Sequence, residues 1–304
     1  MIVALAGNNS FALRERLDEL TAEFVKKYGD LAVEKFDGTE VEFPAVLDAV
    51  QSHPFLAERK LVIVRDASDN KQLAEQIEQI ISSISDSTDL IFYEPLTDKR
   101  TTFYKTLKAK SQFEEFNELD AQGLTNWLLS EATLQGLSLQ RADANYLMRR
   151  IGQNQQRLAS ELEKLATYDK LISRESVDYL TEPTPQSKIF DLLDAAFGGN
   201  KPMALKLYSD QRAQKVEPQA ILAMLAWQLN ILTLCKLAGD RQPAQIAKDA
   251  GLSPFPVMKA SSLARRIDDK QLKKLVHEAL EMDFQSKTKT YDLDEALKTY
   301  IAIM

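Results

Sequence analysis

The chain has 304 residues and a formal net charge of −7, and its apolar and charged fractions are ordinary for a folded soluble protein. The length allows about two or three domains with their own cores. The negative charge argues against a protein that coats nucleic acid by itself, because phosphate contacts need a basic surface. The only cysteine, Cys235, excludes an internal disulfide and fits a reducing compartment. With no run of about 18 uncharged apolar residues and no signal peptide, we expect a cytoplasmic protein without a membrane segment.

Strands alternate with helices over the first part of the chain. Apolar runs predict four strands, and a more polar stretch predicts a fifth, at residues 2–6, 31–36, 61–64, 89–93 and 113–116. Ser10 can cap the first helix, whose apolar residues recur at three- and four-residue spacing. This alternation favours right-handed crossovers and a mainly parallel sheet that helices cover on both faces. The sequence therefore predicts an α/β domain over residues 1–119.

The pattern after residue 119 is helical, and no further strand is expected. Helix breaks at Gly136 and Gly152 divide residues 120–184 into the short helices of a small domain. The segment Glu182-Pro183-Thr184-Pro185 is the best linker candidate, since two nearby prolines stop a helix and stiffen the residues after it. Residues 185–304 then form a third domain. Its long apolar stretch at 221–237 is hydrophobic around most of its circumference, which is typical of the central helix of a bundle.

The turn after the first strand invites comparison with a phosphate-binding loop. Such a loop needs G-x-x-x-x-G-K-[ST], whose lysine reaches the β- and γ-phosphates and whose hydroxyl binds magnesium. Here the turn reads Gly7-Asn8-Asn9-Ser10-Phe11-Ala12, without the second glycine or the lysine, and Arg14 lies one turn too far along the helix to replace it. The strand at 61–64 ends in Arg65-Asp66 without adjacent acids for a metal. We therefore expect the shape of a nucleotide pocket without its chemistry, and no bound cofactor.

The sequence offers no other catalytic constellation. His53, His277 and Cys235 are too few for a Cys/His zinc cluster, and the glycine motifs of esterases and dinucleotide-binding proteins are absent. Glu114 and Glu115 are adjacent on a strand, so they point to opposite faces and do not form a catalytic pair. We expect no catalytic residue and no metal site. The balance favours a protein that binds over one that catalyses.

The segment Gln51-Ser52-His53-Pro54-Phe55-Leu56-Ala57-Glu58-Arg59-Lys60 precedes the buried strand at 61–64. Its apolar pair, Phe55 and Leu56, is not part of that strand, because the segment is too polar and is broken by Pro54. Two interpretations are open from these residues alone. The pair is either tucked beneath its own loop as core or offered to a partner protein.

Taken together, several stretches resemble the delta subunits of bacterial DNA polymerase III clamp loaders, over nearly the whole chain. The strand-Gly-Asn-Asn-Ser-Phe start is similar to the degenerate phosphate loop of that family. Residues 54–65 are close to the family pattern plF-ekRLVvvr, and residues 96–105 resemble lDkRkklyK. The most specific piece is Glu161-Leu162-Glu163-Lys164-Leu165, which comes after Trp127-Leu128 and the two glycine breaks. The order and spacing of these pieces carry the resemblance.

The resemblance implies an AAA+-like α/β domain at 1–119, a helical lid domain at 120–184 and a helical collar domain at 185–304. It implies a subunit that binds the beta sliding clamp and opens its ring for loading onto primed DNA, without hydrolysing ATP. Family members make this contact through a Q-x-x-x-L-F arrangement, matched here by Gln51, Phe55 and Leu56 with the apolar pair reversed. The tau/gamma and delta-prime subunits would be partners through the collar. The related delta-prime subunit itself carries a four-cysteine zinc module, which a single cysteine excludes.

Two other functions remain open at this stage. One is an AAA+ ATPase with an atypical phosphate loop, and the other is a helical scaffold subunit of another replication or repair complex. As part of a DNA polymerase III holoenzyme, the chain would be classed with DNA-directed DNA polymerase without catalysing the reaction. Basic pairs at Arg149-Arg150, Arg265-Arg266 and Lys273-Lys274 fit solvated helix faces, or a nucleic-acid channel shared with other subunits.

Overall fold

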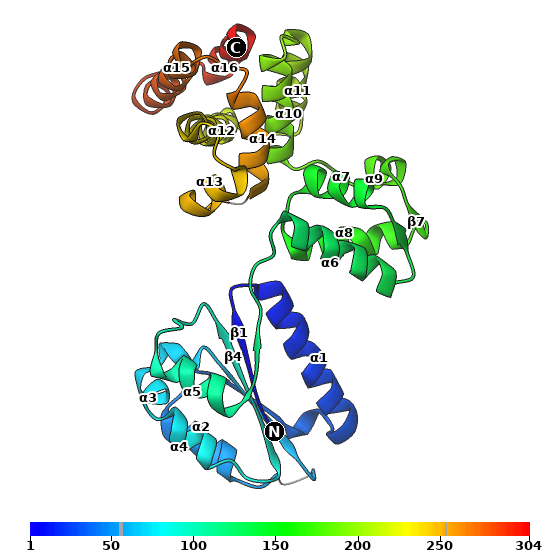
Figure 1. Cartoon of the computed structure of the whole chain (residues 1–304), viewed down its shortest axis with the longest axis vertical. Coiled ribbons are helices and arrows are strands. Elements are labelled where there is room, and N and C mark those ends of the chain that lie inside the picture. Colours follow the sequence, from blue (N-terminus) through cyan, green and yellow to red (C-terminus); the bar gives the residue numbers. More distant parts are fainter. Residues whose placement is uncertain (55–56, 253) are drawn as a thin grey trace. The chain divides into compact units, whose positions relative to one another are not determined.

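The computed structural model describes residues 1–54, 57–252 and 254–304 (Figure 1). The chain divides into two compact units, Met1–Leu119 and Asp120–Met304. The first unit contains a five-stranded sheet and the second is almost entirely helical, so the predicted combination of an α/β part and an all-α part is confirmed. Phe55 and Leu56, two of the three predicted partner-binding residues, lie outside the described residues.

All five strands of the first unit run parallel. They are β1 (Ile2–Gly7), β2 (Val33–Asp37), β3 (Lys60–Arg65), β4 (Thr88–Pro95) and β5 (Gln112–Glu115), in the spatial order β2-β3-β4-β1-β5. The start of the second strand was predicted too early, because Leu31 and Ala32 belong to a 3-10 turn, η1 (Asp30–Ala32). β1 and β4 are neighbours from which the chain continues in opposite directions across the sheet, from β1 to β2 at one edge and from β4 to β5 at the other. In open parallel sheets, ligands bind outside the carboxyl ends of the strands at such a point.

Helices cover the two faces of this sheet unequally. One face carries α1 (Ser10–Tyr28), and the other carries α2 (Phe43–Gln51), α3 (Lys71–Glu75), α4 (Ile77–Ser82) and α5 (Thr102–Lys110) (Figure 1). The strands alternate accordingly. Leu61 and Ile63 pack in the α1 core, whereas Val62 and Val64 pack in the core beneath α2 to α5. Because side chains of the central strands are buried on both faces, these strands read as continuous apolar runs.

Two helix predictions in this unit were inaccurate at their boundaries. The cap of α1 is Asn9, whose side chain accepts a hydrogen bond from the Ala12 N–H at 3.0 Å, and Ser10 is the first helical residue. The spacing of Leu73, Ile77, Ile80, Ile81 and Ile84 predicts one amphipathic helix, but the backbone leaves the helical region at Gln76 and the segment forms α3 and α4. Leu73, Ile77 and Ile80 are buried in α3 and α4, as they would be in one continuous helix. Their periodicity alone therefore did not reveal the break.

The second unit begins with α6 (Ala121–Leu134), α7 (Arg141–Ile151), α8 (Gln155–Ala166) and α9 (Arg174–Leu180). The prediction of no strand after residue 119 is wrong. β6 (Ser138–Leu139) and β7 (Leu171–Ile172) pair in parallel, and the Ser138 N–H donates to the Lys170 carbonyl at 2.7 Å. Strands of two residues are too short to show an alternating pattern.

The predicted linker is hydrogen-bonded to the end of α7. The Thr184 N–H donates to the Arg150 carbonyl at 2.9 Å, and the Ser187 hydroxyl donates to the Arg149 carbonyl at 2.8 Å. The Arg150 guanidinium donates to the Thr181 carbonyl at 2.8 Å. Thr184 also caps α10 (Pro185–Phe197), which begins with the second proline. The prolines therefore start a helix at a hydrogen-bonded junction.

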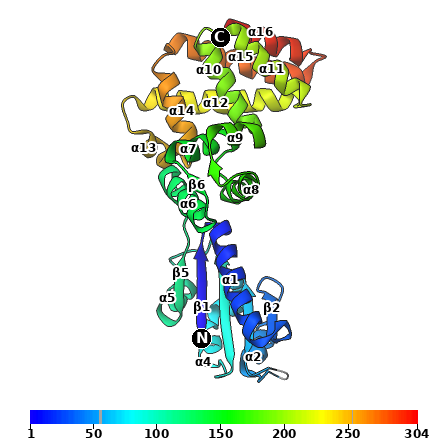
Figure 2. The ribbon, with the colours of Figure 1, turned by 90° about the vertical axis from the view of Figure 1, so that its right-hand side faces the viewer.

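The rest of the second unit is a helical bundle. It contains α10 and six further helices: α11 (Lys201–Ala213), α12 (Pro218–Ala238), α13 (Pro243–Ala250), α14 (Pro254–Ala264), α15 (Asp269–Thr288) and α16 (Leu293–Ile303). As predicted, α12 is central and contacts α10 and α13 to α16 (Figure 2). Among the described helices, α12 alone is long and apolar enough to cross a membrane. Its buried side chains, among them Leu225, Leu229 and Leu232, pack in the bundle core, as those of a core helix do.

Candidate functional site

The turn after β1 is closed by the segment that comes after β5. The Asn9 N–H, which a phosphate-binding loop would turn toward its ligand, donates instead to the Phe116 carbonyl at 3.1 Å. The Asn8 side-chain oxygen accepts the Glu118 N–H at 2.8 Å, and the Phe116 N–H donates to the Ala6 carbonyl at 2.8 Å. The backbone and side chains of this turn are therefore engaged with their own chain.

Gly7 shows how tightly this closure fits. Its φ is 131°, and a Cβ built on it would lie 1.9 Å from the Phe116 carbonyl oxygen. No side chain fits in that space, so glycine is required here by both the backbone angle and the close approach of the residue that follows β5. The backbone of residue 116 therefore fills the space on the Cβ side of Gly7. We call this arrangement of Gly7, Asn8 and Asn9 with residues 116–118 the sealed turn.

The carboxyl ends of β3 and β4 place two carboxyl groups near the sealed turn. Glu94, in β4, is fully buried and accepts the N–H groups of Ala67 and Ser68 at 2.8 and 3.2 Å. Asp66, directly after β3, has a left-handed backbone with φ of 52°. Burial, and then the charge of Asp69, raises its pKa. Within the described residues no group of acids, histidines or cysteines could hold a metal ion.

Glu94 makes the stability of the first unit depend on pH. Burial raises its pKa from 4.5 to about 7, although hydrogen bonds from Ser68 and Ala67 oppose the shift. Between those two pH values the folded state binds more protons than the unfolded state, so this group makes stability fall as pH rises. As the pH rises from 4 to 8, the free energy of unfolding of Glu94→Gln should increase by about 3 kcal/mol relative to that of the wild type. Both tryptophans, Trp127 and Trp227, lie in the second unit. Tryptophan fluorescence would therefore report on the second unit. Urea unfolding of the first unit should be followed by pulsed hydrogen exchange in peptides of β1 and β4.

The same substitution at the exposed Glu23 is the control for losing a surface charge. A difference between Glu94→Gln and the wild type that stays constant from pH 4 to pH 8 would contradict the assigned role of Glu94.

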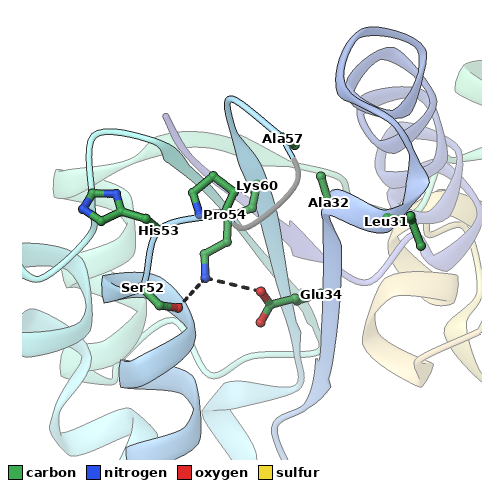
Figure 3. Close-up of a pocket in the computed structure, with 8 residues that line it drawn as sticks. All are labelled: Leu31, Ala32, Glu34, Ser52, His53, Pro54, Ala57 and Lys60. Carbon is green, nitrogen blue, oxygen red and sulfur yellow. Dashed lines mark hydrogen bonds and ion pairs between the residues drawn. The ribbon is translucent and has the colours of Figure 1, made fainter.

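The other end of the sheet carries the connection that contains the predicted partner-binding residues. Gln51 is exposed as the last residue of α2, and the connection runs from Ser52 to Arg59, directly before β3 begins at Lys60. Of the three predicted residues the structure therefore describes only Gln51, since Phe55 and Leu56 lie outside the described residues. A cavity of about 230 Å³ lies between this connection and η1 (Figure 3). It is lined by Leu31, Ala32, Glu34, Ser52, His53, Pro54, Ala57 and Lys60.

Lys60 forms the polar floor of this cavity. Its side chain is only 4% exposed, and its ammonium group donates to the Ser52 hydroxyl at 2.7 Å and to Glu34 at 3.3 Å (Figure 3). Sequence reasoning missed this role of Lys60. The available signal was a charged residue placed directly before a buried apolar run, where a long side chain must find a partner. Leu31 was also missed, because the predicted strand would have paired it, whereas it is 84% exposed beside the cavity.

Arg59 fixes the end of the connection in a second way. Its guanidinium donates to both oxygens of Asp89, at 2.7 and 3.1 Å, and to the Asp86 carbonyl at 2.8 Å. Asp89 also accepts the Met1 amino group at 2.7 Å. Burial alone would raise the pKa of Asp89, but hydrogen bonds from Arg59 and the amino group lower it overall. Bidentate pairs of this kind are geometrically specific. The chain therefore enters β3 in a fixed direction.

Several of the basic side chains considered as nucleic-acid contacts are engaged within the chain. Arg150 pairs with Asp178 at 2.9 Å and also bonds the Thr181 carbonyl, and Lys274 lies 3.7 Å from Glu278. Arg266 donates to the Phe197 carbonyl at 3.4 Å. These contacts favour the solvated-face interpretation for those three residues. A contact of this chain with DNA stays a prediction.

Comparison with known proteins gives consistent results for both units. The family model described as DNA polymerase III, delta subunit, matches residues 4–117, and the model for the C-terminal domain of the DNA polymerase III delta subunit matches residues 186–304. DNA polymerase III subunit delta of Bacillus subtilis (strain 168) is 23% identical over 318 residues, covering 99% of this chain and 91% of the relative. The structure of the Bacillus subtilis DNA clamp loader delta protein (YqeN) has a TM-score of 0.75 at 22% identity. It covers 99% of this chain and 94% of that chain, and it shows the same fold.

Proposed function

Because this chain belongs to the DNA polymerase III delta-subunit family, we propose that it binds the ring-shaped beta sliding clamp and opens one interface of the ring. The open clamp is then loaded onto primed DNA by the clamp loader, of which this chain is one subunit. The chain itself does not hydrolyse ATP. The observation that supports this last part is the sealed turn, in which the Asn9 N–H and the Asn8 side chain are bonded to residues 116–118 where a phosphate loop would use such groups for its ligand.

The proposed contact with the clamp is made by Gln51, Phe55 and Leu56. Burying the two apolar side chains in a pocket of the clamp contributes about 3–6 kcal/mol before the cost of association. Gln51, exposed at the end of α2, supplies a hydrogen bond at the rim. Leu31, which lines the neighbouring cavity and is mostly exposed, extends the apolar surface. The contact lies at the amino ends of the strands, and the sealed turn lies at their carboxyl ends.

Opening the ring requires more than binding it. A ligand shifts an equilibrium only by the difference between its affinities for the two states. In this proposal the chain binds a clamp with one distorted or open interface more tightly than the closed ring. To move the clamp from about one open ring in a hundred to about ninety-nine, that preference must be about 10⁴-fold, or about 5.5 kcal/mol. Burial of Phe55 and Leu56 in a pocket that both states present contributes equally to both affinities and nothing to this difference, so a wider surface of the first unit takes part.

The other proposed partners are the tau/gamma and delta-prime subunits, held through a collar domain at residues 185–304. The division into an α/β domain at 1–119, a lid at 120–184 and this collar is part of the proposal. α12 and α15 are joined by a hydrogen bond from Gln219 to Ser286 at 2.9 Å, and several of their apolar side chains are exposed. These are Trp227, Leu237, Val276, Leu280 and Phe284. Such side chains would gain most from contact with another subunit. Primed DNA as a partner and a cytoplasmic location complete the proposal.

Release of a clamp from DNA tests this function. The isolated full chain, without nucleotide, is expected to release sliding clamps from a nicked circular plasmid, because stabilising an open interface needs no hydrolysis by this subunit. Clamp remaining on DNA would be measured by gel filtration after incubation with the chain. Buffer without the chain is the control for spontaneous loss, and a linear plasmid is the control for a clamp that can slide off intact.

A further inference from the structure

One side chain ties together the two ends of the connection between α2 and β3. Lys60, the first residue of β3, reaches back eight positions to the hydroxyl of Ser52, the residue directly after α2. Its ammonium group also pairs with Glu34 of β2 (Figure 3). We call this set of Lys60, Ser52 and Glu34 the neck, because the whole connection lies between the residues that it joins.

The neck is anchored to the sheet. The Lys60 backbone N–H donates to the Ser87 carbonyl at 2.9 Å, and Lys60 pairs with Thr88 of β4 in the ladder. Glu34 is likewise a strand residue, in register with Val62. Since these partners are held by the strands, the hydrogen bond to Ser52 fixes the end of α2 relative to the sheet. The bidentate pair of Arg59 with Asp89 fixes the other end.

We propose that Lys60 is a positioning residue for the clamp contact: it closes the neck and so holds together the two ends of the connection that carries Phe55 and Leu56. This inference rests on the proposed function. A connection with both ends held loses less conformational entropy on binding than one with a free end. The neck therefore acts on affinity for the clamp without touching the clamp.

A purely structural role for Lys60 predicts a different outcome. If the ion pair served only the stability of β3, its loss would loosen the strand and leave the affinity of the folded chain unchanged. Lys60→Met separates the two roles, because methionine keeps an unbranched apolar stem and removes the ammonium group. Removing one partner of a buried ion pair is costly when the other charge stays buried, but the Glu34 side chain is 44% exposed and stays solvated after the substitution. Ser52→Ala opens the neck from its other side and leaves the pair of Lys60 with Glu34 in place.

The experiment compares clamp affinity for the wild-type full chain, Lys60→Met, Ser52→Ala and the variant with both changes, by fluorescence titration of labelled sliding clamp. We expect each single variant to bind about fivefold more weakly, as for the ordering of one or two side chains. The combined variant should be no weaker than either single one, because both changes break the same bond. Lys71→Met, which removes a largely exposed lysine of α3, is the control for charge and should bind like the wild type.

Hydrogen exchange supplies a second measurement on the same proteins. Peptides that cover residues 52–59 should exchange faster in both neck variants, and peptides of β3 and β4 should not change. If β3 also exchanges faster in Lys60→Met, Ser52→Ala decides the question. Wild-type affinity in Ser52→Ala, or additive losses in the combined variant, would overturn the inference. Failure of the wild-type chain to bind the clamp at all would instead remove the proposed function.

Discussion

Replacing Phe55 and Leu56 together with alanine is expected to weaken binding to the sliding clamp by at least about a hundredfold. Each truncation removes most of the apolar area of its own side chain, which a pocket on the clamp would cover. Apolar anchors of this kind dominate interface energies, whereas the contacts around them mainly exclude water. The loss should appear as faster dissociation, because truncating an anchor leaves the encounter of the two proteins almost unchanged.

Titration of labelled clamp with the two proteins measures this effect, and stopped-flow mixing separates the two rate constants. A matched control is Leu134→Ala/Leu171→Ala, which truncates two exposed leucines of the second unit. The control should bind like the wild type. Equal affinity of the Phe55→Ala/Leu56→Ala protein and the wild type, with intact hydrogen-exchange protection in β3, would remove the proposed clamp contact.

Replacing Gly7 with alanine is expected to destabilise the first unit by about 3–5 kcal/mol, a large part of the stability of a domain of this size. The added Cβ would meet the backbone of Phe116 at 1.9 Å, which no side-chain rotation can relieve. The chain must either move the end of β5 or distort the end of β1. Either change breaks the hydrogen bonds from Phe116 to Ala6 and from Asn9 to Phe116.

Gly29→Ala is the control for the backbone angle. Gly29 also has a positive φ, of 89°, but a Cβ there meets no atom within 4 Å. Its substitution should cost only the backbone strain, about 1–2 kcal/mol. Urea unfolding, followed by pulsed hydrogen exchange in peptides of β1 and β4, measures both variants. If Gly7→Ala is no less stable than Gly29→Ala, residue 116 does not seal the turn.

The sequence was sufficient to predict the sheet because the strands carry strong local signals. Leu61 to Val64 are buried on both faces, and a continuous apolar run of that length directly before a turn is typical of a central parallel strand. The expectation of a turn without nucleotide chemistry came from the missing lysine after Gly7, and it stays a prediction. Both inferences depend on residues that are neighbours in the sequence.

The sealed turn and the neck were not predictable in the same way. Closure of the turn depends on Phe116, more than a hundred positions from Gly7, and no local pattern shows which backbone segment fills a pocket. The neck depends on a lysine reaching Glu34 of a neighbouring strand, which requires the register of the sheet. Phe55 and Leu56 were assigned by resemblance to a family. Their composition alone would have fitted a buried loop equally well.

Clamp release from nicked circular DNA tests the central claim most directly, because it requires both binding and opening. The full chain should release the clamp at the same rate with and without ATP, in proportion to the amount of chain until the clamp is saturated. A folded chain that leaves the clamp on DNA at saturating concentration, or that releases it only when ATP is present, would contradict the account.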